Sequence, residues 1–220
     1  MIGMILAAGR GERMMPLTEN TPKPLIKVQN IALIEHSISA LKKANITDVV
    51  INISYLGEQI KSHLGDGSDF GVNIQYSDES SNALETAGGI IKALPLLGDK
   101  PFVVINSDVL CDYDLSKLTL PIGSLAHLVL INNPAHNPKG DFSLINSHQV
   151  ITANSKSFTF SGIGVYHPAF FKNHTNAQGK LPLYPLLKEA LATNQLSGEH
   201  YQGYWQDVGT PERLEQANNS

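Results

Sequence analysis

Apolar and polar positions change their spacing repeatedly along the first half of the chain. Apolar runs typical of strands alternate with stretches in which apolar residues recur every three or four positions, as on one face of a helix. The strands are expected at 2–6, 48–53, 72–76 and 101–105, and the helices at 33–44, 56–64 and 86–97. Strands that alternate with helices are typical of βαβ units, so the pattern predicts a parallel sheet covered by helices.

The second half of the chain is richer in strand patterns. Strands are expected at 125–131, 141–145, 149–152 and 158–166, and helices at 182–192 and 211–217. Thr210 is the expected N-cap of the last helix, because it precedes Pro211, a residue suited to a first helical turn. No repeat, low-complexity tract or linker divides the chain, so we predict one α/β domain over 1–220 with three layers and a mostly parallel, mixed central sheet.

The carboxyl ends of the predicted parallel strands should carry the binding site, as they do in open α/β sheets. The segments that follow Leu6, Tyr76 and Ile105 are therefore expected to line it. Gly9 and Gly11 come shortly after the first strand, but the third glycine of the dinucleotide-binding fingerprint is missing, and no Walker P-loop signature occurs. The loop is thus neither of these two phosphate-binding motifs.

The composition of this first loop still favours a phosphate ligand. Glycines adopt backbone conformations that other residues avoid, and the small side chains of Ala7 and Ala8 let a ligand approach the main chain. Backbone N–H groups together with Arg13 are suited to hold a triphosphate. For this segment alone, the alternative is an ordinary glycine-rich strand exit.

A lysine between two prolines follows the loop, in the sequence Pro22-Lys23-Pro24. The two proline rings fix φ on both sides of the lysine, a restraint that an ordinary surface lysine does not need. A rigidly held ammonium group is useful where a phosphate must be met in a fixed geometry. We therefore expect Lys23 to contact a phosphate, with a proline-rich surface turn as the alternative.

Charge and cysteine content exclude several classes of protein. The 220 residues include 16 Lys and Arg against 20 Asp and Glu, a net charge of −4, whereas nucleic-acid binders usually carry a basic surplus. The single cysteine, Cys111, excludes an internal disulfide and a multi-thiolate zinc site, and is expected to be a buried structural thiol. The sequence shows neither a long apolar run nor a signal peptide. We therefore expect no nucleic-acid or membrane partner and a cytoplasmic location.

Several short motifs follow one another in a fixed order along the whole chain. They are Leu-Ala-Ala-Gly-x-Gly-x-Arg-Met-x-Pro-Leu-Thr at 6–18, Pro-Lys-Pro at 22–24, Leu-Glu-Thr-Ala-Gly-Gly at 84–89, Asn-Ser-Asp-Val at 106–109, Ser-Gly at 161–162 and Trp-Gln-Asp-Val-Gly-Thr at 205–210. In this order the motifs resemble those of the sugar-1-phosphate nucleotidylyltransferases. The resemblance implies a Rossmann-like, GT-A-like nucleotide-diphospho-sugar transferase fold, with a nucleotide-binding half at 1–110 and a sugar-binding half at 111–220.

Members of this family transfer a nucleotidyl group from a nucleoside triphosphate to a sugar 1-phosphate. The sugar phosphate attacks the α-phosphorus and pyrophosphate leaves, so charge neutralisation and alignment matter more than a protein nucleophile. The nucleotide-binding residues that the resemblance implies are Ala7, Ala8, Gly9, Gly11, Glu12, Arg13, Lys23, Ala87, Gly88 and Asn106. Of these, Arg13 and Lys23 are expected to act in catalysis through the phosphates.

Two aspartates are the metal ligands that the resemblance implies. Asp108 follows the predicted strand at 101–105, and Asp207 lies in the Trp-Gln-Asp-Val-Gly-Thr motif. A carboxylate at the edge of a buried strand needs a cation, and Mg²⁺ held by one or two carboxylates and by substrate phosphates is the ordinary solution. Asp108 and Asp207 are therefore expected to bind Mg²⁺ and to act in catalysis, with a helix-capping role as the alternative.

The second substrate is harder to predict than the reaction. The expected sugar-binding residues are Glu85, Gly140, Asp141 and Gly162. Within the family, the segments at 140–142 and 197–201 resemble a compact bacterial subgroup that joins UTP and N-acetylmuramic acid α-1-phosphate in peptidoglycan recycling. UTP and this sugar 1-phosphate are thus the expected substrates. The protein is expected to be a monomer. Glucose, mannose or heptose 1-phosphate with UTP, dTTP or GTP is the alternative.

Three features depart from the family pattern or compete with it. Position 85 is glutamate where many members have glycine, and no lysine near 158–161 matches a second sugar-phosphate lysine of larger relatives. Asp112-Tyr113-Asp114 has the Asp-x-Asp spacing with which many glycosyltransferases hold a metal, although Asp114 could simply cap a short helix. A metal-dependent glycosyltransferase and a non-enzymatic nucleotide-sugar sensor are the rival hypotheses. The presence of the clamped lysine and of both predicted metal ligands favours the nucleotidylyltransferase.

Overall fold

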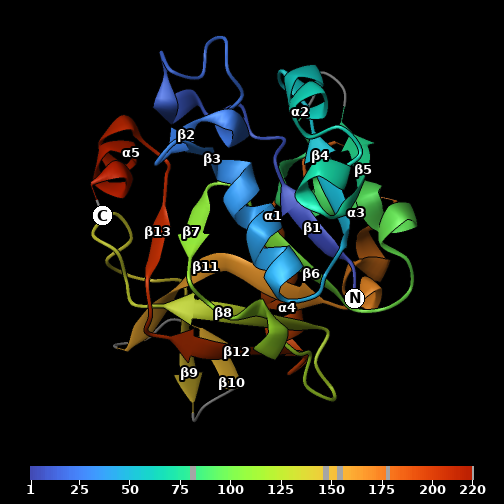
Figure 1. Cartoon of the computed structure of the whole chain (residues 1–220). Helices are drawn as coiled ribbons and strands as arrows, with labels where there is room; N and C mark the ends of the chain where they lie inside the picture. The colour runs from blue at the N-terminus through green and yellow to red at the C-terminus, as the bar shows by residue number, and fades with distance from the viewer. Residues whose placement is uncertain (80–82, 146–148, 153–155, 177–178, 220) are drawn as a thin grey trace.

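The computed structural model describes residues 1–79, 83–145, 149–152, 156–176 and 179–219. A mixed sheet forms the middle of the molecule, and helices pack on both of its faces (Figure 1). The same sheet contains strands from both halves of the chain. Among the helices so described, none has the length and apolar character needed to cross a membrane.

The long elements agree with the apolar spacing of the sequence. The strands of the main sheet are β1 (Gly3–Leu6), β4 (Asp48–Ile53), β5 (Asn73–Asp78), β6 (Phe102–Asn106), β8 (Ala126–Ile131), β9 (Phe142–Ile145), β10 (Gln149–Thr152), β11 (Ser157–Tyr166) and β12 (Leu196–Tyr201). Two ribbons add β2 (Lys27–Val28) with β3 (Ile31–Ala32), and β7 (Val109–Cys111) with β13 (Trp205–Asp207). The α-helices are α1 (Leu33–Lys43), α2 (Gly57–Leu64), α3 (Glu85–Leu97), α4 (Leu183–Ala192) and α5 (Pro211–Asn218). Every predicted helix and strand is present, with ends within two residues of the expectation.

The first half of the sheet is parallel, as the alternation of strands and helices predicts. Within the described residues the strand order is β5-β4-β1-β6-β11-β8-β12-β10-β9, and the first four of these strands are parallel neighbours. Leu6 at the end of β1 pairs with Asn52 on one side and with Asn106 on the other. The loops that follow these strands therefore share one edge of the sheet, where the binding site is expected.

The second half of the sheet contains both parallel and antiparallel neighbours. β11 runs antiparallel to β6 and β8, and β10 runs antiparallel to β9 and β12, while β8 and β12 are a parallel pair. The sequence does not predict β12, because Leu-Ser-Gly-Glu-His-Tyr lacks the apolar run or alternation that marks the other strands. The sheet is thus parallel in the first half of the chain and mixed in the second, as expected for a mixed sheet.

The strand side chains divide between two cores. Met4 and Val50 belong to the core beneath α3 and α4, whereas Ile5 and Ile51 belong to the core beneath α1 and α2. Each of these four side chains is at most 1% exposed. Because successive residues of a strand point to opposite faces, the sheet buries both faces and forms the middle of three layers, as predicted.

The β7–β13 ribbon brings a late segment of the chain to the edge of the sheet. The two strands are antiparallel, and Asp207 lies opposite Val109. Just beyond this pair, the N–H of Val208 donates to the carbonyl of Asp108 at 2.8 Å. Asp108, in the turn just before β7, and Asp207, on β13, therefore lie beside one another in the fold although they are far apart in the sequence.

Candidate active site

A cleft of about 350 Å³ lies at the carboxyl edge of the parallel strands. Its walls come from the loop after β1, from the ends of β4 and β6, and from the start of α3. The lining residues are Leu6, Ala7, Ala8, Gly9, Arg10, Lys23, Pro24, Asn52, Glu79, Ala83, Glu85, Thr86, Asn106, Ser107, Asp108 and Lys180. Many of the predicted nucleotide-binding residues therefore line one cleft together with a predicted metal ligand.

Lys23 forms an ion pair with Asp108 inside this cleft. The side chain of Lys23 is 13% exposed and that of Asp108 is 22% exposed, so both charges are largely withdrawn from water. Lys23 begins a short 3-10 helix at Lys23–Leu25, in which the N–H of Leu25 donates to the carbonyl of Pro22 at 2.8 Å. The local backbone thus holds the ammonium group in a defined place.

Gly11 shapes the first loop so that it packs against this lysine. Its φ is +70°, in the left-handed region, and its carbonyl accepts hydrogen bonds from the N–H of Met14 and the hydroxyl of Thr18, both at 2.8 Å. A Cβ atom on Gly11 would lie 3.0 Å from the Cβ of Lys23. The position therefore favours glycine both for its backbone conformation and for the space it leaves.

The second predicted metal ligand, Asp207, pairs with a different cation. Nη1 of Arg213 donates to both carboxylate oxygens of Asp207, at 2.7 and 2.6 Å, and Nε2 of His136 lies 3.4 Å from one of them. Arg213 is in the first turn of α5, where Thr210 is the N-cap, as predicted. The Thr210 hydroxyl accepts from the N–H of Arg213 at 3.4 Å, so the cap stabilises the turn that carries this arginine.

Asp207 and Arg213 line a second and larger cavity, of about 780 Å³. This cavity is bounded by β13, by α5 and by the segments that follow β8 and β12. Arg13 lines the second cavity and is not among the residues that line the cleft with Lys23. The first loop thus reaches both cavities, whereas Glu12 is exposed and lines neither of them.

A hydrogen-bonded chain of buried side chains lies at one wall of the cleft. Nδ2 of Asn52 donates to a carboxylate oxygen of Glu79 at 2.6 Å, and Oδ1 of Asn52 accepts from the N–H of Ala7 at 2.8 Å. The other carboxylate oxygen of Glu79 accepts from the N–H of Leu84 at 2.8 Å. Asn52 and Glu79 are only 3% and 4% exposed. The chain joins the loop after β1 to the segment that enters α3.

Two predicted nucleotide-binding residues, Ala87 and Gly88, are not among those that line the cleft. Ala87 is fully buried in the core beneath α3, and the N–H of Gly88 donates to the carbonyl of Leu181 at 3.1 Å. Their neighbours Glu85 and Thr86 line the cleft instead. The glycine-rich segment therefore presents its first residues to the cleft, while the next ones serve the packing of α3.

Two of the predicted sugar-binding residues lie at or beside the cleft. Glu85 lines it directly, at the start of α3. Gly162 has a φ of +83° and packs against Asn106, because a Cβ atom there would lie 2.6 Å from Nδ2 of the asparagine. Gly162 thus leaves room for a residue of the cleft wall.

The other two predicted sugar-binding residues, Gly140 and Asp141, line neither of the two cavities. The carboxylate of Asp141 accepts from the N–H of Phe160 at 2.8 Å and from Nδ2 of Asn137 at 3.1 Å. Gly140 has a φ of +62°, and a Cβ atom there would lie 2.6 Å from Oδ1 of Asn133. Both residues hold the turn before β9 against β11, and the structure does not bring them to Lys23.

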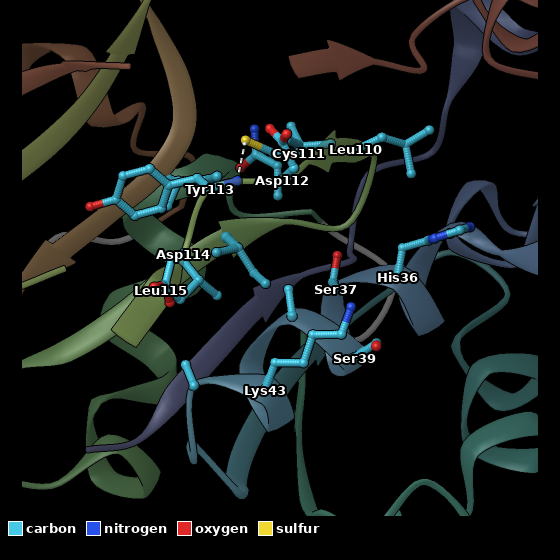
Figure 2. Close-up of a pocket in the computed structure, with 16 residues that line it drawn as sticks. His36, Ser37, Ser39, Lys43, Leu110, Cys111, Asp112, Tyr113, Asp114 and Leu115 are labelled. Carbon is cyan, nitrogen blue, oxygen red and sulfur yellow. Dashed lines mark hydrogen bonds between the residues drawn. The ribbon is translucent and has the colours of Figure 1, made fainter. Parts of the chain in front are cut away.

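The Asp-x-Asp motif lies at a third cavity, of about 390 Å³, between α1 and the segment 109–115. Figure 2 shows Asp112 and Asp114 on the opposite wall of this cavity from the labelled residues of α1. Asp112 accepts a hydrogen bond from the hydroxyl of Tyr201, and Asp114 caps a short 3-10 helix by accepting from the N–H of Ser116 at 3.1 Å. Within the described ranges no group of three or more His, Cys, Asp or Glu could hold a metal. The capping alternative for Asp114 is thus confirmed.

Cys111 is a half-buried thiol at the same cavity. Burial raises the pKa of its thiol to about 11, above the ordinary range for cysteine. The N–H of Tyr113 lies 3.4 Å from its sulfur (Figure 2). Because such a thiol stays protonated at neutral pH, Cys111 is poorly suited to act as a nucleophile.

Four of the lining residues that the sequence does not predict contact other groups of the site through side-chain hydrogen bonds or ion pairs, namely Asn52, Glu79, His136 and Arg213. Asn52 alone leaves a signal in the sequence, because it is the polar residue within the apolar run 49–53, close to the end of a predicted strand. The other three carry no motif, and their partners are set by strand register and helix placement.

Comparison with known proteins identifies the family. The family model described as nucleotidyl transferase matches residues 2–220. The chain belongs to the nucleotidyl transferase family. N-acetylmuramate alpha-1-phosphate uridylyltransferase of Neisseria meningitidis serogroup B is 49% identical, over 99% of this chain and 96% of that protein. A relative of the same name from Caulobacter vibrioides is 30% identical, over 96% of this chain and 93% of that protein.

Other nucleotidyl transferases with different named substrates are also similar. Mannose-1-phosphate guanyltransferase of Hypocrea jecorina is 32% identical over 96% of this chain, which spans 61% of that protein. A solved structure described as a glucose-1-phosphate thymidylyltransferase from Bacillus anthracis, in complex with sucrose, matches with a TM-score of 0.86 and 25% identity. The match covers 99% of this chain and 94% of the other. The α/β fold expected from the resemblance is therefore the fold of this family.

Proposed function

We propose that the chain joins UTP and N-acetylmuramic acid α-1-phosphate, giving UDP-N-acetylmuramic acid and pyrophosphate. The observation that carries the proposal is the Lys23–Asp108 pair, which lies beside the first loop at the carboxyl edge of the sheet. The choice of substrates is supported by 49% identity to the Neisseria relative over 99% of the chain. In this proposal residues 1–110 bind the nucleotide and residues 111–220 contribute the sugar site.

The reaction brings two anions together. An oxygen of the sugar phosphate forms a bond to the α-phosphorus of UTP, the bond from that phosphorus to the bridging oxygen breaks, and pyrophosphate leaves. The attacking phosphate is already ionised at neutral pH, so the protein has to supply alignment and charge neutralisation. We assign Lys23 to the α-phosphate, because its ammonium group is held in the cleft and largely withdrawn from water.

The first loop supplies the nucleotide-phosphate site in this proposal. Ala7, Ala8 and Gly9 line the cleft, and a Cβ atom on Gly9 would meet no other atom within 4 Å. The space beside Gly9 is therefore open for a ligand that approaches the backbone. We assign Asn106, Glu85 and the start of α3 to the ribose and base side of the same cleft, in place of the buried Ala87.

Two arginines provide cations on the other side of the reacting phosphates. Arg13 and Arg213 line the second cavity together with Asp207. A Cβ atom on Gly209 would lie 3.2 Å from a guanidinium nitrogen of Arg13, so Arg13 reaches the segment that joins Asp207 to α5. We propose that these arginines neutralise the phosphate of the sugar, a role that a second lysine has in larger relatives. This assignment places the sugar in the second cavity, which Gly140 and Asp141 do not line.

Mg²⁺ is the proposed metal cofactor, and the donor set fits it. Asp108, in the turn before β7, and Asp207, on β13, supply carboxylate oxygens, the hard donors that Mg²⁺ takes. Two carboxylates suit an ion that is completed by water and substrate phosphates and needs no protein cage. When bound, Mg²⁺ would supply further neutralisation of the phosphate charge. Lys23 and Arg213 keep the two carboxylates oriented at the edge of the site.

The test is a set of kcat/KM measurements across triphosphates and sugar 1-phosphates, with pyrophosphate release as the readout. UTP with N-acetylmuramic acid α-1-phosphate should be the best pair. A preference of about tenfold or more for glucose 1-phosphate would contradict the sugar assignment, since this ratio is a difference of about 1.4 kcal/mol in transition-state binding. Release of UDP from a nucleotide sugar, with no pyrophosphate from any pair, would instead support a glycosyltransferase.

We further propose that the protein acts as a monomer in the cytoplasm, where UTP is available, in the recycling of cell-wall sugar. Sedimentation of the purified protein should give a mass near 23.9 kDa. A stable dimer at low micromolar concentration would contradict the monomer.

A further inference from the structure

The buried pair Asn52–Glu79 connects two walls of the cleft. Asn52 is near the end of β4, and Glu79 follows the end of β5. Through hydrogen bonds of 2.6 to 2.8 Å the pair joins the N–H of Ala7, on the first loop, to the N–H of Leu84, which precedes α3. Both walls line the cleft, Ala7 on one side and the start of α3 on the other.

Burial and the packing of α3 also hold the Asn52–Glu79 pair in place. A carboxylate that is 4% exposed is costly unless its oxygens are hydrogen-bonded, and here both oxygens accept. A Cβ atom on Gly89 would overlap both the carboxylate of Glu79 and Nδ2 of Asn52. The backbone of α3 therefore packs directly on the pair, so the position of the helix relative to the first loop depends on it.

We propose that Asn52 and Glu79 are positioning residues that set the separation between the first loop and the start of α3, and thereby the affinity for the nucleotide. The inference rests on the proposed function, because it assumes that UTP lies between these two walls. Neither residue has to touch the reacting phosphates. Their effect is exerted through the N–H groups of Ala7 and Leu84, which they fix in place.

The direction of the hydrogen bonds gives this proposal a sharp test. Asn52 accepts from Ala7 and donates to Glu79, which also accepts from Leu84. Asn52→Asp would place two carboxylates face to face, and Glu79→Gln would place two amide NH₂ groups face to face. In the double variant the aspartate accepts from Ala7 and from the new glutamine, whose carbonyl oxygen still accepts from Leu84. The exchange thus restores every hydrogen bond and the net charge.

The experiment is calorimetric titration of the full chain with UTP, for the wild-type protein, both single variants and the double variant. Each single variant should weaken UTP binding by about tenfold or more, since a hydrogen bond to a charged group contributes ~1.5–3 kcal/mol. The double variant should return to within about threefold of wild type, the signature of two directly coupled sites. In turnover assays the change should fall on KM for UTP more than on kcat.

A surface pair on the same two strands supplies the matched control. Nδ2 of Asn73 donates to Oδ1 of Asp48 at 3.2 Å, and the pair is exposed. Both residues are at the N-terminal ends of β4 and β5, whereas Asn52 and Glu79 are at the C-terminal ends. The exchange Asp48→Asn with Asn73→Asp should leave the Kd for UTP within about twofold of wild type, because exposed polar pairs contribute little.

Several outcomes would overturn the inference. If only the charge of Glu79 mattered, Glu79→Gln would bind the anionic UTP more tightly and Asn52→Asp less tightly, instead of both binding it more weakly. A double variant that fails to fold, or that binds UTP no better than the weaker single variant, also contradicts the proposal, even where a single variant is too unstable to measure. If the wild-type chain itself does not bind UTP, the proposed function fails first, and the inference fails with it.

Discussion

Lys23 is the side chain on which the proposed chemistry depends most. Its side chain is 13% exposed, and its ammonium group pairs with Asp108 beside the turn that contains two prolines. Preorganised groups that stabilise charge in a transition state contribute ~10²–10³ in kcat, because they need no reorganisation during the reaction. Lys23→Ala should therefore lower kcat by about this factor, with a smaller change in KM. Lys27→Ala, on an exposed residue of β2, is the control, and near-normal kcat in Lys23→Ala would contradict the role.

Asp207 provides the test of the metal assignment. Asp207→Asn keeps the shape of the side chain but removes one of the two carboxylates proposed to hold Mg²⁺. The Mg²⁺ concentration for half-maximal activity should rise by about tenfold or more, since even the outer partners of metal ligands are worth 10–100-fold in affinity. The matched control is Asp99→Asn, on an exposed aspartate that precedes β6, whereas Asp108 follows the other end of that strand. An unchanged Mg²⁺ requirement in Asp207→Asn would show that this aspartate binds Arg213 and does not bind Mg²⁺.

The burial of the Cys111 thiol can be tested by measuring how its alkylation rate depends on pH. Its pKa is raised to about 11 by burial, so the reactive thiolate forms only as the pH approaches that value. The rate of alkylation by iodoacetamide should still rise about tenfold per pH unit between pH 8 and 10 in the folded protein. In urea the rate should level off above pH ~9, as for an ordinary thiol. Equal pH profiles in the two states, measured by mass spectrometry, would contradict the raised pKa.

At the scale of elements, the end of the chain acts on the site through β13 and α5. β13 places Asp207 beside the segment that contains Asp108, and α5 carries the arginine that holds Asp207. These are short elements, a strand of three residues and a helix of eight. Their placement therefore depends on a few local contacts, of which the N-cap of α5 is one.

Removal of that N-cap should have a measurable cost. Thr210→Ala should lower the free energy of unfolding by about 1 kcal/mol, because the first turn of α5 loses its side-chain acceptor. Urea denaturation measures the effect, and Thr47→Ala, on an exposed threonine before β4, is the control. Since Arg213 lies in that turn, the activity of Thr210→Ala should fall as well. Unfolding free energies that match in the two variants would show that the 3.4 Å contact contributes nothing.

The elements also show what sequence spacing can predict. Strands such as β4 and β6 and helices such as α1 contain enough apolar positions to reveal their period, and the sequence predicts them closely. β7 and β13 have three residues each, too few for any period, and β12 is half polar. They form because a partner strand is present, which is a property of the tertiary structure and not of the local sequence.

The candidate site also contains residues that the sequence predicts and contacts that it does not predict. Lys23, Asp108 and Asp207 occur in motifs whose residue types and order can be read directly. Two pairs, Asp207 with Arg213 and Asn52 with Glu79, depend on how distant segments are placed in the fold. No sequence motif predicts either pair. Asp141 shows the same limit, because its motif does not reveal that its carboxylate accepts from the N–H of Phe160 in β11.

At the scale of the whole molecule, charge is arranged to suit small anions. The chain has a net charge of −4, yet the first thirty residues contain Arg10, Arg13, Lys23 and Lys27 against two glutamates, a local charge of +2. The fold adds Lys180 to the cleft and Arg213 to the second cavity. The cleft thus has three cations against three carboxylates, and the second cavity has two arginines against Asp207. Neither cavity is acidic although the whole chain is, which favours two phosphate-bearing substrates over a polyanionic surface.

We propose that the whole molecule transfers a uridylyl group from UTP to a sugar 1-phosphate without a covalent enzyme intermediate. This transfer is tested most directly with UTP radiolabelled either at the α-phosphorus or at the γ-phosphorus, in the presence of N-acetylmuramic acid α-1-phosphate and Mg²⁺. The account predicts that all α-label enters UDP-N-acetylmuramic acid and that all γ-label is released as pyrophosphate, in equal amounts. Release of γ-label as inorganic phosphate, or α-label that stays bound to the denatured protein, would contradict it.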